Sequence, residues 1–291
     1  MDAFDLDAYF CRIGYRGATR PDLATLNGLV YHHARAIPFE NLDQLVGRPV
    51  ELDAEALQRK LVAGGRGGYC YEHNLLLRHA LTRLGFVTSG LAARVQWGRA
   101  ASAPPPGRTH MALRVELDEG PYLADVGFGG LTLTAALRLE PEVVQSTPHD
   151  RLRLRPRGPE LDLQTLLRNE WSTLYTLDMS EATLADYEIA NWYLTTHPGS
   201  RFLHELMVAR AGDDHRLTLH DRVLRVHGTD GATRVRELLG ASDVIRVLEN
   251  EFGLDLRGMD DLESALELRL SPPGASYDAP GGTERTRPQR K

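Results

Sequence analysis

The chain has 291 residues, of which 42% are hydrophobic and 25% are charged, so it is long enough to bury a sizeable core in two or three subdomains. Its formal net charge of −6 argues against a general nucleic-acid binder, because such proteins carry a concentrated Lys/Arg surface. It contains two cysteines, Cys11 and Cys70, which is too few for a disulfide scaffold and fits a reducing cytoplasm. We find no secretory-signal pattern at the start and no apolar run of roughly 20 residues, so we expect a cytoplasmic protein without a membrane partner.

The first part of the chain has apolar residues at helical spacing. This spacing predicts helices over residues 22–36 and 53–62, the second opened by an aspartate cap. Another apolar helical run, at 75–81, follows a glycine turn at 67–68. We therefore expect residues 1–86 to form a small helical bundle.

The middle part changes to the alternating pattern of β-strands. Strands are predicted at 91–97, 110–117 and 121–126, with a turn at 118–120, and further along at 151–155, 161–167 and 171–177. The segment 101–107 holds three consecutive prolines, which lack the backbone N–H and restrict the residue before them. It is therefore expected to be a surface loop in a β region built on hairpins.

The last part mixes both patterns. Helices are predicted at 181–193, 241–252 and 260–268, and strands around 202–209, 215–220 and 222–227, which together indicate an α/β unit. Residues 271–291 are rich in Pro, Gly and charge and too poor in apolar groups to offset the entropy of ordering. We expect this tail to be disordered.

Cys70 stands between the glycine turn and the third helical run. Unpaired N–H groups and the positive end of the helix dipole would stabilise its thiolate, which is the nucleophilic form of cysteine. A reactive cysteine is therefore the leading hypothesis for this position. Cys11 lies in an apolar helical setting and is expected to be structural.

A thiol nucleophile benefits from an imidazole that takes its proton and from a carboxylate that orients the imidazole. His110 opens one predicted strand, and Asp125 closes the next. Counting from the hairpin turn, the two positions are close but offset, so a contact between them needs a bulge or a diagonal pairing. Taken singly, Cys70 is more typical of a buried small hydrophobe, His110 of a half-exposed strand residue and Asp125 of a turn-forming acid.

Other interpretations use the neighbours of these residues. His73 is a rival base because it lies three positions after Cys70 on one helix face, although two side chains of one short turn rarely approach a substrate atom from opposite sides. The same pair would form half of a zinc site, but no second thiol pair completes it, so we expect no metal. The glycine-rich turn 127–130 permits close backbone approach but lacks the lysine of a phosphate-binding loop.

Several segments resemble the arylamine N-acetyltransferase family, in the family's order and approximate spacing, over about residues 1–270. They are Ile37-Pro38-Phe39-Glu40-Asn41, Arg66-Gly67-Gly68-Tyr69-Cys70-Tyr71-Glu72-His73-Asn74, Thr109-His110, Ala124-Asp125-Val126-Gly127-Phe128-Gly129-Gly130, Asn191-Trp192-Tyr193, Thr196-His197-Pro198 and Ser200-Arg201-Phe202. The resemblance implies an α+β fold with a papain-like cysteine-enzyme architecture. Its parts would be an N-terminal helical bundle with the nucleophile (1–86), a β-barrel with the His and Asp (87–190) and an α/β lid (191–270).

The resemblance also implies an activity typical of xenobiotic metabolism. Acetyl-CoA would be the acyl donor, and acetyl would pass by a ping-pong reaction through acetyl-Cys70 to an arylamine, arylhydrazine or N-hydroxyarylamine. His110 would be the imidazole partner and Asp125 the orienting carboxylate, while His73 falls at a variable position of the family pattern. Glu40 and Arg66 would be a buried acid–base pair that braces the active-site loop.

Substrate contacts are implied in the same way. Phe39, Val95 and Phe128 would be apolar walls of the acceptor pocket, and the acetyl-donor channel would be lined by Gly127, Gly129, Gly130 and Thr132. The proline-rich segment 103–107 departs from the family pattern at the rim of that pocket. Two other classes of protein stay open. A papain-like thiol hydrolase or transglutaminase relative would use the same three residues, and an inactive binding module would use none of them for catalysis. The sequence leaves the preferred amine, the acyl chain length and the oligomeric state open.

Overall fold

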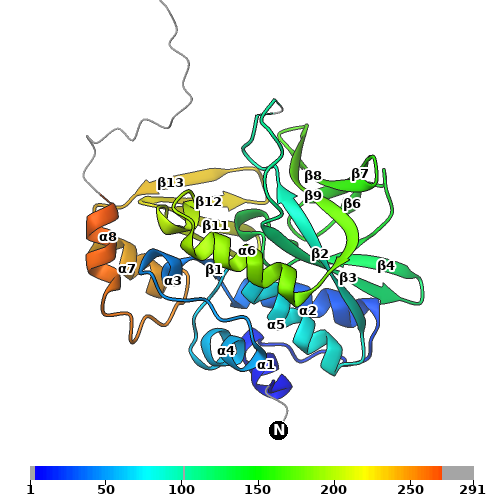
Figure 1. Ribbon diagram of the computed structural model, residues 1–291, viewed down its shortest axis with the longest axis horizontal. Helices are drawn as coiled ribbons and strands as arrows, with labels where there is room; N and C mark the ends of the chain where they lie inside the picture. Colours follow the sequence, from blue (N-terminus) through cyan, green and yellow to red (C-terminus); the bar gives the residue numbers. More distant parts are fainter. Residues whose placement is uncertain (1–3, 101, 271–291) are drawn as a thin grey trace, which may run out of the picture.

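The computed structural model describes residues 4–100 and 102–270, so the tail predicted to be disordered lies outside the described residues. Figure 1 shows the elements in chain order. The helices are α1 (Leu6–Ile13), α2 (Leu23–Ala36), α3 (Leu42–Leu45), α4 (Ala54–Leu57), α5 (Cys70–Arg83), α6 (Leu184–Thr196), α7 (Ala241–Asn250) and α8 (Leu262–Arg269). Short π or 3₁₀ turns are η1 (Gln58–Ala63), η2 (Gly129–Leu131) and η3 (Arg201–Leu203). The strands are β1 (Phe39–Glu40), β2 (Val87–Val95), β3 (His110–Leu117), β4 (Gly120–Ala124), β5 (Leu137–Arg138), β6 (Gln145–Ser146), β7 (Arg151–Arg157), β8 (Glu160–Leu167), β9 (Glu170–Ala182), β10 (Met207–Ala211), β11 (His215–His220), β12 (Val223–Gly228) and β13 (Thr233–Glu237).

Aspartate caps begin the helices of the N-terminal part. The side chains of Asp5, Asp22 and Asp53 accept hydrogen bonds from the backbone N–H three residues later, each a contribution of about 1 kcal/mol. The predicted helix over 22–36 is confirmed as α2, and the one over 53–62 is confirmed as α4 continued by the π-helical turn η1. The buried faces of α1, α2 and α5 pack together with β3 and β4 in one hydrophobic core.

An eight-stranded antiparallel sheet forms the middle of the molecule, with strand order β5-β4-β3-β2-β9-β8-β7-β6. The predicted hairpin turn is confirmed, because Leu117 pairs with Gly120 across the β3–β4 turn. The sheet curls around its own core of leucines. Its two outer strands approach each other at Gln145, whose side-chain amide donates to the carbonyl oxygen of Arg138 at 2.9 Å and accepts from its N–H at 2.7 Å.

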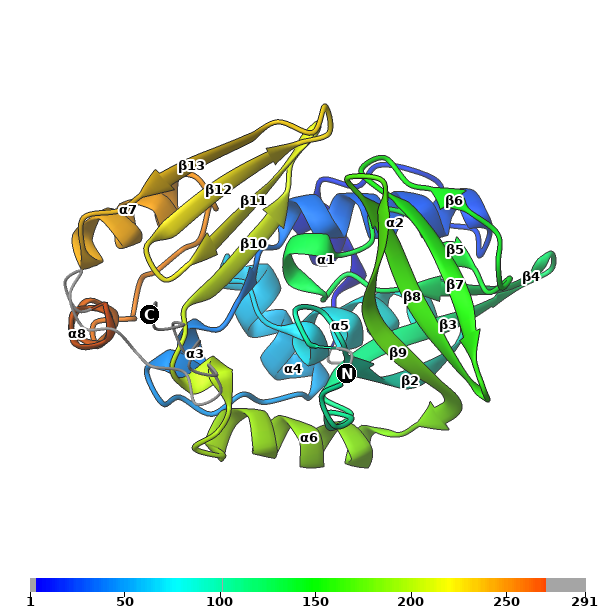
Figure 2. The same cartoon turned by 90° about the horizontal axis from the view of Figure 1, so that it is seen from above.

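A second, five-stranded antiparallel sheet has the order β1-β10-β11-β12-β13. Its first strand comes from the N-terminal part, since Phe39 pairs with Ala209 of β10. Helices α7 and α8 pack on this sheet around a separate core. Figure 2 shows the two sheets on opposite sides of the molecule, with α5 between them and α6 running along one edge from β9 toward the second sheet.

The structure differs from the predicted elements where the local pattern is ambiguous. The helix expected over 181–193 begins at Leu184, because β9 continues to Ala182 and Thr183 caps the helix through Asp186. The strand expected from 202 begins at Met207, after the turn η3. Strand β13 was not predicted, because its five residues are all exposed and show no apolar alternation. The predicted α+β class is confirmed.

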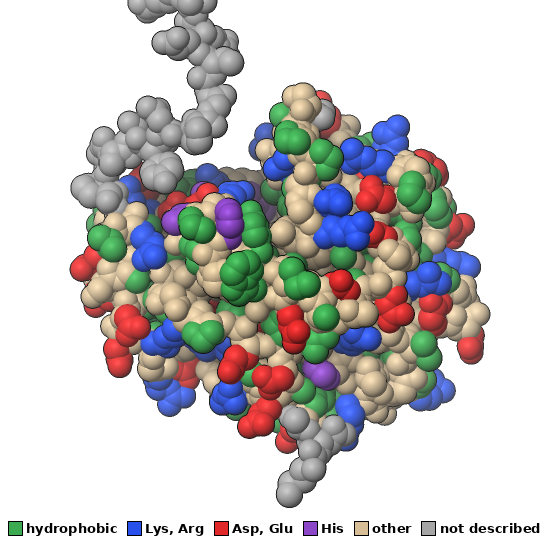
Figure 3. Space-filling view, viewed as in Figure 1, with side chains coloured by type: hydrophobic (Ala, Val, Ile, Leu, Met, Phe, Trp, Pro, Cys, Tyr) green, Lys and Arg blue, Asp and Glu red, His purple; other side chains and the backbone are tan. Residues whose placement is uncertain are grey.

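The surface carries charges of both signs interspersed over the face seen in Figure 3. Hydrophobic side chains gather there over α6, where Ile189 and Trp192 are exposed. Within the part of the chain that the structure describes, none of the helices combines the length and the apolar character needed to cross a bilayer. Cys11, expected in an apolar setting, lies exposed on α1.

Candidate active site

Cys70 is the first residue of α5, directly after the glycine turn. The turn must be made of glycines, because a Cβ at Gly67 would lie 2.0 Å from the carbonyl oxygen of Pro38 and one at Gly68 would lie 2.6 Å from Oε2 of Glu72. Glu72 accepts a hydrogen bond from the backbone N–H of Tyr69 at 3.0 Å, which fixes the start of the helix. The sulfur is therefore held at the positive end of a 14-residue helix.

His110 and Asp125 meet across the β3–β4 hairpin. Since Leu113 pairs with Ala124, Asp125 continues the register opposite Ala112, two residues from His110. The contact is thus the diagonal one of the two geometries predicted from the sequence, and Nε2 of His110 lies 2.7 Å from Oδ2 of Asp125. Both side chains are buried, with 3% and 0% of their surface exposed.

The charges of this pair stabilise each other. Burial disfavours the His110 imidazolium, but the charge of the Asp125 carboxylate and hydrogen bonds of the ring to Asp125 and Cys70 outweigh burial and raise the pKa of His110 to about 10. Burial also opposes ionisation of Asp125, but the charge of His110 and hydrogen bonds from His110, Asn74 and the Gly127 N–H lower its pKa. At neutral pH the pair is an imidazolium and a carboxylate.

The thiol of Cys70 lies beside the same imidazole. Its Sγ is 3.7 Å from the carbonyl oxygen of Thr109, and its hydrogen bond to His110 is among the interactions that raise the pKa of the imidazole. Because Nε2 of His110 faces Asp125, Nδ1 is the ring nitrogen available to the sulfur. The structure therefore brings together a sulfur, an imidazole and a carboxylate from α5, β3 and the end of β4. This arrangement can generate a thiolate and later return a proton.

Asn74 was missed in the sequence interpretation. It lies one turn after Cys70 and is completely buried. Its Nδ2 donates to Oδ1 of Asp125 at 3.0 Å and to the carbonyl oxygen of Met111 at 2.8 Å, and its Oδ1 accepts from the N–H of Val126 at 3.0 Å. One side chain thus joins the helix of the sulfur to the strand of the imidazole and to the carboxylate. The only sequence signal is its i+4 spacing from Cys70.

Aromatic side chains enclose the imidazole. The rings of Phe128 and Tyr175 have their centroids 5.1 and 4.8 Å from that of His110. Val95, at the end of β2, pairs with Tyr175 of β9, so the two side chains lie on the same face of the sheet. Phe39 lies elsewhere, with its ring 6.4 Å from that of His73 and 6.3 Å from that of Phe202.

The glycine-rich turn after Asp125 packs tightly against its neighbours. A Cβ at Gly127 would lie 2.7 Å from Cα of Cys70, so this residue allows the turn to contact the start of α5. Gly129 lies against the ring of Phe39, and Gly130 faces Thr218 of β11. Thr132 donates through Oγ1 to the carbonyl oxygen of Asp125 at 3.1 Å. The turn, which follows β4 of the eight-stranded sheet, therefore contacts β1 and β11 of the five-stranded sheet beside Cys70.

Glu40 and Arg66 form a buried ion pair. Oε1 of Glu40 accepts from Nε and Nη2 of Arg66 at 3.0 and 2.7 Å, and its Oε2 accepts from the N–H of Leu42 at 2.6 Å. Asp43 extends the pair into a network, since its carboxylate lies 3.3 Å from Nη2 of Arg66 and 2.5 Å from Nζ of Lys60. The same Nζ lies 2.7 Å from Oε1 of Glu72, at the start of α5. Lys60 and Glu72 were not singled out from the sequence, because a lone charge in a helix is more typical of a solvated face.

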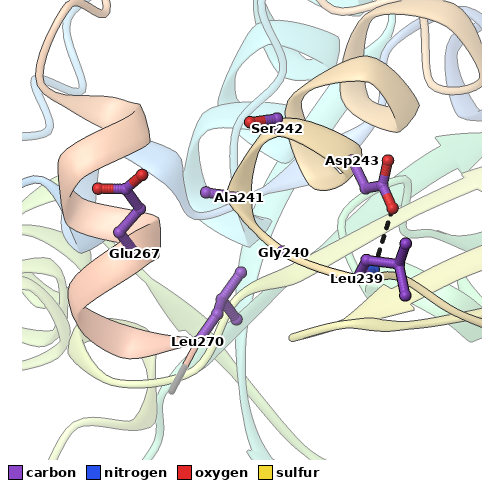
Figure 4. Close-up of a pocket in the computed structure, with 7 residues that line it drawn as sticks. All are labelled: Leu239, Gly240, Ala241, Ser242, Asp243, Glu267 and Leu270. Atoms are coloured by element: carbon purple, nitrogen blue, oxygen red, sulfur yellow. Dashed lines mark hydrogen bonds between the residues drawn. The ribbon is translucent and has the colours of Figure 1, made fainter. Parts of the chain in front are cut away.

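The rival interpretations of His73 do not match its contacts. Its Nε2 is 3.1 Å from the carbonyl oxygen of Pro38, and its Nδ1 is 2.9 Å from Nε2 of His33, so both nitrogens face away from Cys70. Among the described residues, no three His, Cys, Asp or Glu side chains are grouped to hold a metal ion. A surface pocket between the start of α7 and the end of α8, which Figure 4 shows, contains none of the predicted site residues.

Comparison with known proteins shows which enzyme family this chain belongs to. A family model described as N-acetyltransferase matches residues 22–261. An arylamine N-acetyltransferase of Mycolicibacterium smegmatis is 48% identical over 257 residues, which cover 87% of this chain and 93% of the relative. The Escherichia coli arylamine N-acetyltransferase is 38% identical over 88% of this chain and 90% of the relative. The chain belongs to the arylamine N-acetyltransferase family, as its sequence predicted.

Solved structures of this family have the same fold as this chain. The arylamine N-acetyltransferase of Mycobacterium marinum superposes with a TM-score of 0.89 at 44% identity and covers 92% of this chain and 100% of that one. The structure of the same protein in complex with CoA has a TM-score of 0.87, covering 91% of this chain and 98% of that one. These neighbours confirm the fold class.

Proposed function

We propose that this chain is a cytoplasmic acetyl-CoA:arylamine N-acetyltransferase that works through a covalent acetyl-Cys70 intermediate. The observation that carries the proposal is the contact of one buried imidazole, His110, with both a thiol and a carboxylate. Family membership supports the acetyl donor and the arylamine acceptor, since a relative is known in complex with CoA and others are named for arylamines. A Salmonella typhimurium relative is also named as an N-hydroxyarylamine O-acetyltransferase, which supports N-hydroxyarylamines as further acceptors.

In the first half-reaction the Cys70 thiolate attacks the carbonyl carbon of acetyl-CoA. The new bond joins Sγ to the acetyl carbon, and backbone N–H groups at the start of α5 stabilise the negative oxygen that forms. The bond between the acetyl carbon and the CoA sulfur then breaks, and the His110 imidazolium supplies the proton to that sulfur. Acetyl-Cys70 and a neutral imidazole remain.

In the second half-reaction an aromatic amine or hydrazine attacks acetyl-Cys70. His110, now neutral, accepts the proton from the attacking nitrogen, and the thiolate of Cys70 leaves. The ring would lie against Phe128 and Val95, whose apolar side chains limit the access of water to the thioester. Asp125 and Asn74 hold the imidazole throughout, and neither needs to change its protonation state.

The remaining assignments are proposals of the same kind. Glu40 and Arg66 brace the turn before Cys70, and Phe39 is a further acceptor wall. The acetyl donor would approach along the turn formed by Gly127, Gly129, Gly130 and Thr132, and no metal takes part. The helical bundle (1–86), β-barrel (87–190) and α/β lid (191–270) are the proposed units.

The test is to trap the intermediate. The protein is mixed with acetyl-CoA without an amine, and intact-mass measurement with peptide mapping is expected to find one acetyl group on Cys70. Adding an aniline or an arylhydrazine should remove it and yield the N-acetyl product. Cys70→Ser should give no adduct, whereas Cys11→Ser, which changes the exposed cysteine of α1, should behave as wild type. Absence of the adduct in the wild type, or release of acetate without an amine as fast as with one, contradicts the proposal.

A further inference from the structure

Three buried side chains of the helical bundle form a hydrogen-bonded chain that the mechanism above does not use. The hydroxyl of Tyr9 on α1 is 2.8 Å from Nδ1 of His33 on α2. Nε2 of His33 is 2.9 Å from Nδ1 of His73 on α5, and Nε2 of His73 is 3.1 Å from the carbonyl oxygen of Pro38. All three side chains are fully shielded from solvent.

The direction of every hydrogen bond in this chain follows from its last acceptor. A carbonyl oxygen can only accept, so Nε2 of His73 carries a proton and, in the neutral ring, Nδ1 carries a lone pair. Nδ1 must then accept from Nε2–H of His33, which leaves Nδ1 of His33 as the acceptor for the hydroxyl of Tyr9. Both rings are thereby fixed as Nε2–H tautomers.

Neither imidazole is suited to carry a charge. Protonating Nδ1 of His73 would place two N–H groups against each other across a 2.9 Å contact, and protonating Nδ1 of His33 would place its N–H against the hydroxyl proton of Tyr9. Burial, followed by the charges of His73 and Arg12, keeps the pKa of His33 well below its ordinary value. Burial lowers the pKa of His73 to about 4, although the hydrogen bond to Pro38 opposes this shift. The chain is therefore a neutral, directional connector and not a proton relay.

The connector ends on the segment that carries the proposed acceptor wall. The Pro38 carbonyl oxygen also accepts from the N–H of Gly68 at 3.3 Å, and the carbonyl oxygen of Gly68 accepts from the N–H of Glu40 at 2.8 Å. Phe39 is thus held between two hydrogen bonds to the turn that precedes the nucleophile. Its ring lies parallel to that of His73, with an interplanar angle of 15°, and a Cβ at Gly129 would lie 3.5 Å from it.

We propose that His73 is a positioning residue that sets the acceptor geometry by holding the Pro38 carbonyl, and with it the Phe39 ring, in a fixed place relative to Cys70, and that Tyr9 and His33 serve it by fixing its Nε2–H tautomer. This inference rests on the proposed function, because it assigns Phe39 to the aromatic amine. The aromatic amine would contact this wall directly, whereas the acetyl donor would meet it only through Gly129, so the connector affects the second half-reaction more than the first.

Two substitutions at His73 separate positioning from stability. The amide of asparagine reaches the place of Nδ1, and the amide of glutamine reaches the place of Nε2. His73→Asn therefore keeps an acceptor for His33 but loses the donor to Pro38, whereas His73→Gln keeps the donor to Pro38. Both variants lose the ring that stacks on Phe39, and His73→Gln also loses the acceptor for His33. A lower amine KM in His73→Gln than in His73→Asn therefore reports the hydrogen bond to Pro38.

The measurement is steady-state kinetics with an aniline, together with the rate of Cys70 acetylation in the absence of amine. His73→Asn is expected to raise the KM for the amine about tenfold. Cys70 acetylation should slow by much less than about tenfold in both variants. His73→Gln should restore the amine KM even where both variants lower Tm to the same extent. Equal amine KM values in the two variants, or equal slowing of Cys70 acetylation, would overturn the proposal.

A second measurement on the wild-type protein needs no variant. Nitrogen-15 NMR of labelled histidine is expected to show the rings of His33 and His73 as Nε2–H tautomers that do not titrate between pH 5.5 and 8. A proton on Nδ1 of either ring contradicts the direction of the chain. If the wild type forms no acetyl-Cys70, the proposed function fails. The tautomers measured by NMR still show whether the hydrogen bonds of the connector run in the proposed direction.

Discussion

Asp125→Asn perturbs the carboxylate of the proposed triad with almost no change in shape. In the native site Oδ1 of Asp125 accepts from Nδ2 of Asn74 and from the Gly127 N–H, while Oδ2 accepts from Nε2 of His110. An asparagine has one acceptor oxygen, and two donors already point at the place of Oδ1. Its NH₂ group would therefore face the imidazole, make Nε2 an acceptor and move the ring proton to Nδ1, the nitrogen that must take the thiol proton.

The size of the effect follows from the charge pair. A pKa of about 10 for His110, against an ordinary value of 6.5, corresponds to about 5 kcal/mol in favour of the imidazolium. The wrong tautomer in a related Ser-His-Asp site lowers kcat by about 10⁴. We therefore expect Cys70 acetylation to fall by about 10³ to 10⁴ in Asp125→Asn, with a fold that remains intact.

The assay is the rate at which acetyl-CoA acetylates Cys70, followed by quenching and mass measurement, with circular dichroism to monitor the fold. Asp118→Asn is the matched control, since it makes the same chemical change at the exposed turn of the same hairpin. It should acetylate Cys70 at the wild-type rate. If Asp125→Asn acetylates within about tenfold of wild type, the carboxylate does not orient the base and the reasoning is refuted.

The pH dependence has a definite sign. The raised pKa means that the imidazolium persists to about pH 10 and is lost above it, so the alkaline limit of Cys70 acetylation should lie near pH 10. In Asp125→Asn burial, which disfavours the charge, is opposed only by the interaction with Cys70, so the limit should move to lower pH. The stability that protonated His110 adds is complete below pH 6.5 and is lost as the pH rises through about 10. An unchanged alkaline limit in the variant would show that His110 is not the group that titrates.

Three further substitutions test the surroundings of the site. Asn74→Leu keeps the branched shape but removes three hydrogen bonds, so acetylation should slow by about 10², and a wild-type rate would show that this side chain does not position the triad. Arg66→Met leaves the carboxylate of Glu40 buried without its partner. Denaturant titration should therefore find that the free energy of unfolding falls by about 3–5 kcal/mol. A fall below about 1 kcal/mol would contradict the bracing role. Gly127→Ala places a Cβ 2.7 Å from the Cα of Cys70 and should slow acetylation by about 10². The matched change Gly107→Ala meets its nearest atom at 3.5 Å and should have no effect, so equal rates in the two alanine variants would exclude close packing at the turn.

Local patterns in the sequence are enough for most of the elements. The strand expected over 110–117 is found at those residues, and the turn at 118–120 follows it, because alternation and turn residues act over a few positions. Position 70 is at a helix start for a similarly local reason, since two glycines precede it and an acidic residue follows at the third helical position. The family was also predictable, because its motifs are short and keep their order.

Contacts between distant segments needed the tertiary structure. The diagonal approach of His110 to Asp125 depends on the exact register of the hairpin, and composition leaves that register uncertain by a residue or two. Asn74 can be recognised as a link only from the packing of α5 against β3. The hydrogen-bonded chain from Tyr9 through His33 to His73 joins three helices and spans 64 residues of the sequence. Strand β1 joins a sheet whose other strands begin more than 160 residues later. Side-chain periodicity records which face of an element is buried, but not what it is buried against, and so these pairings follow only from how the elements pack.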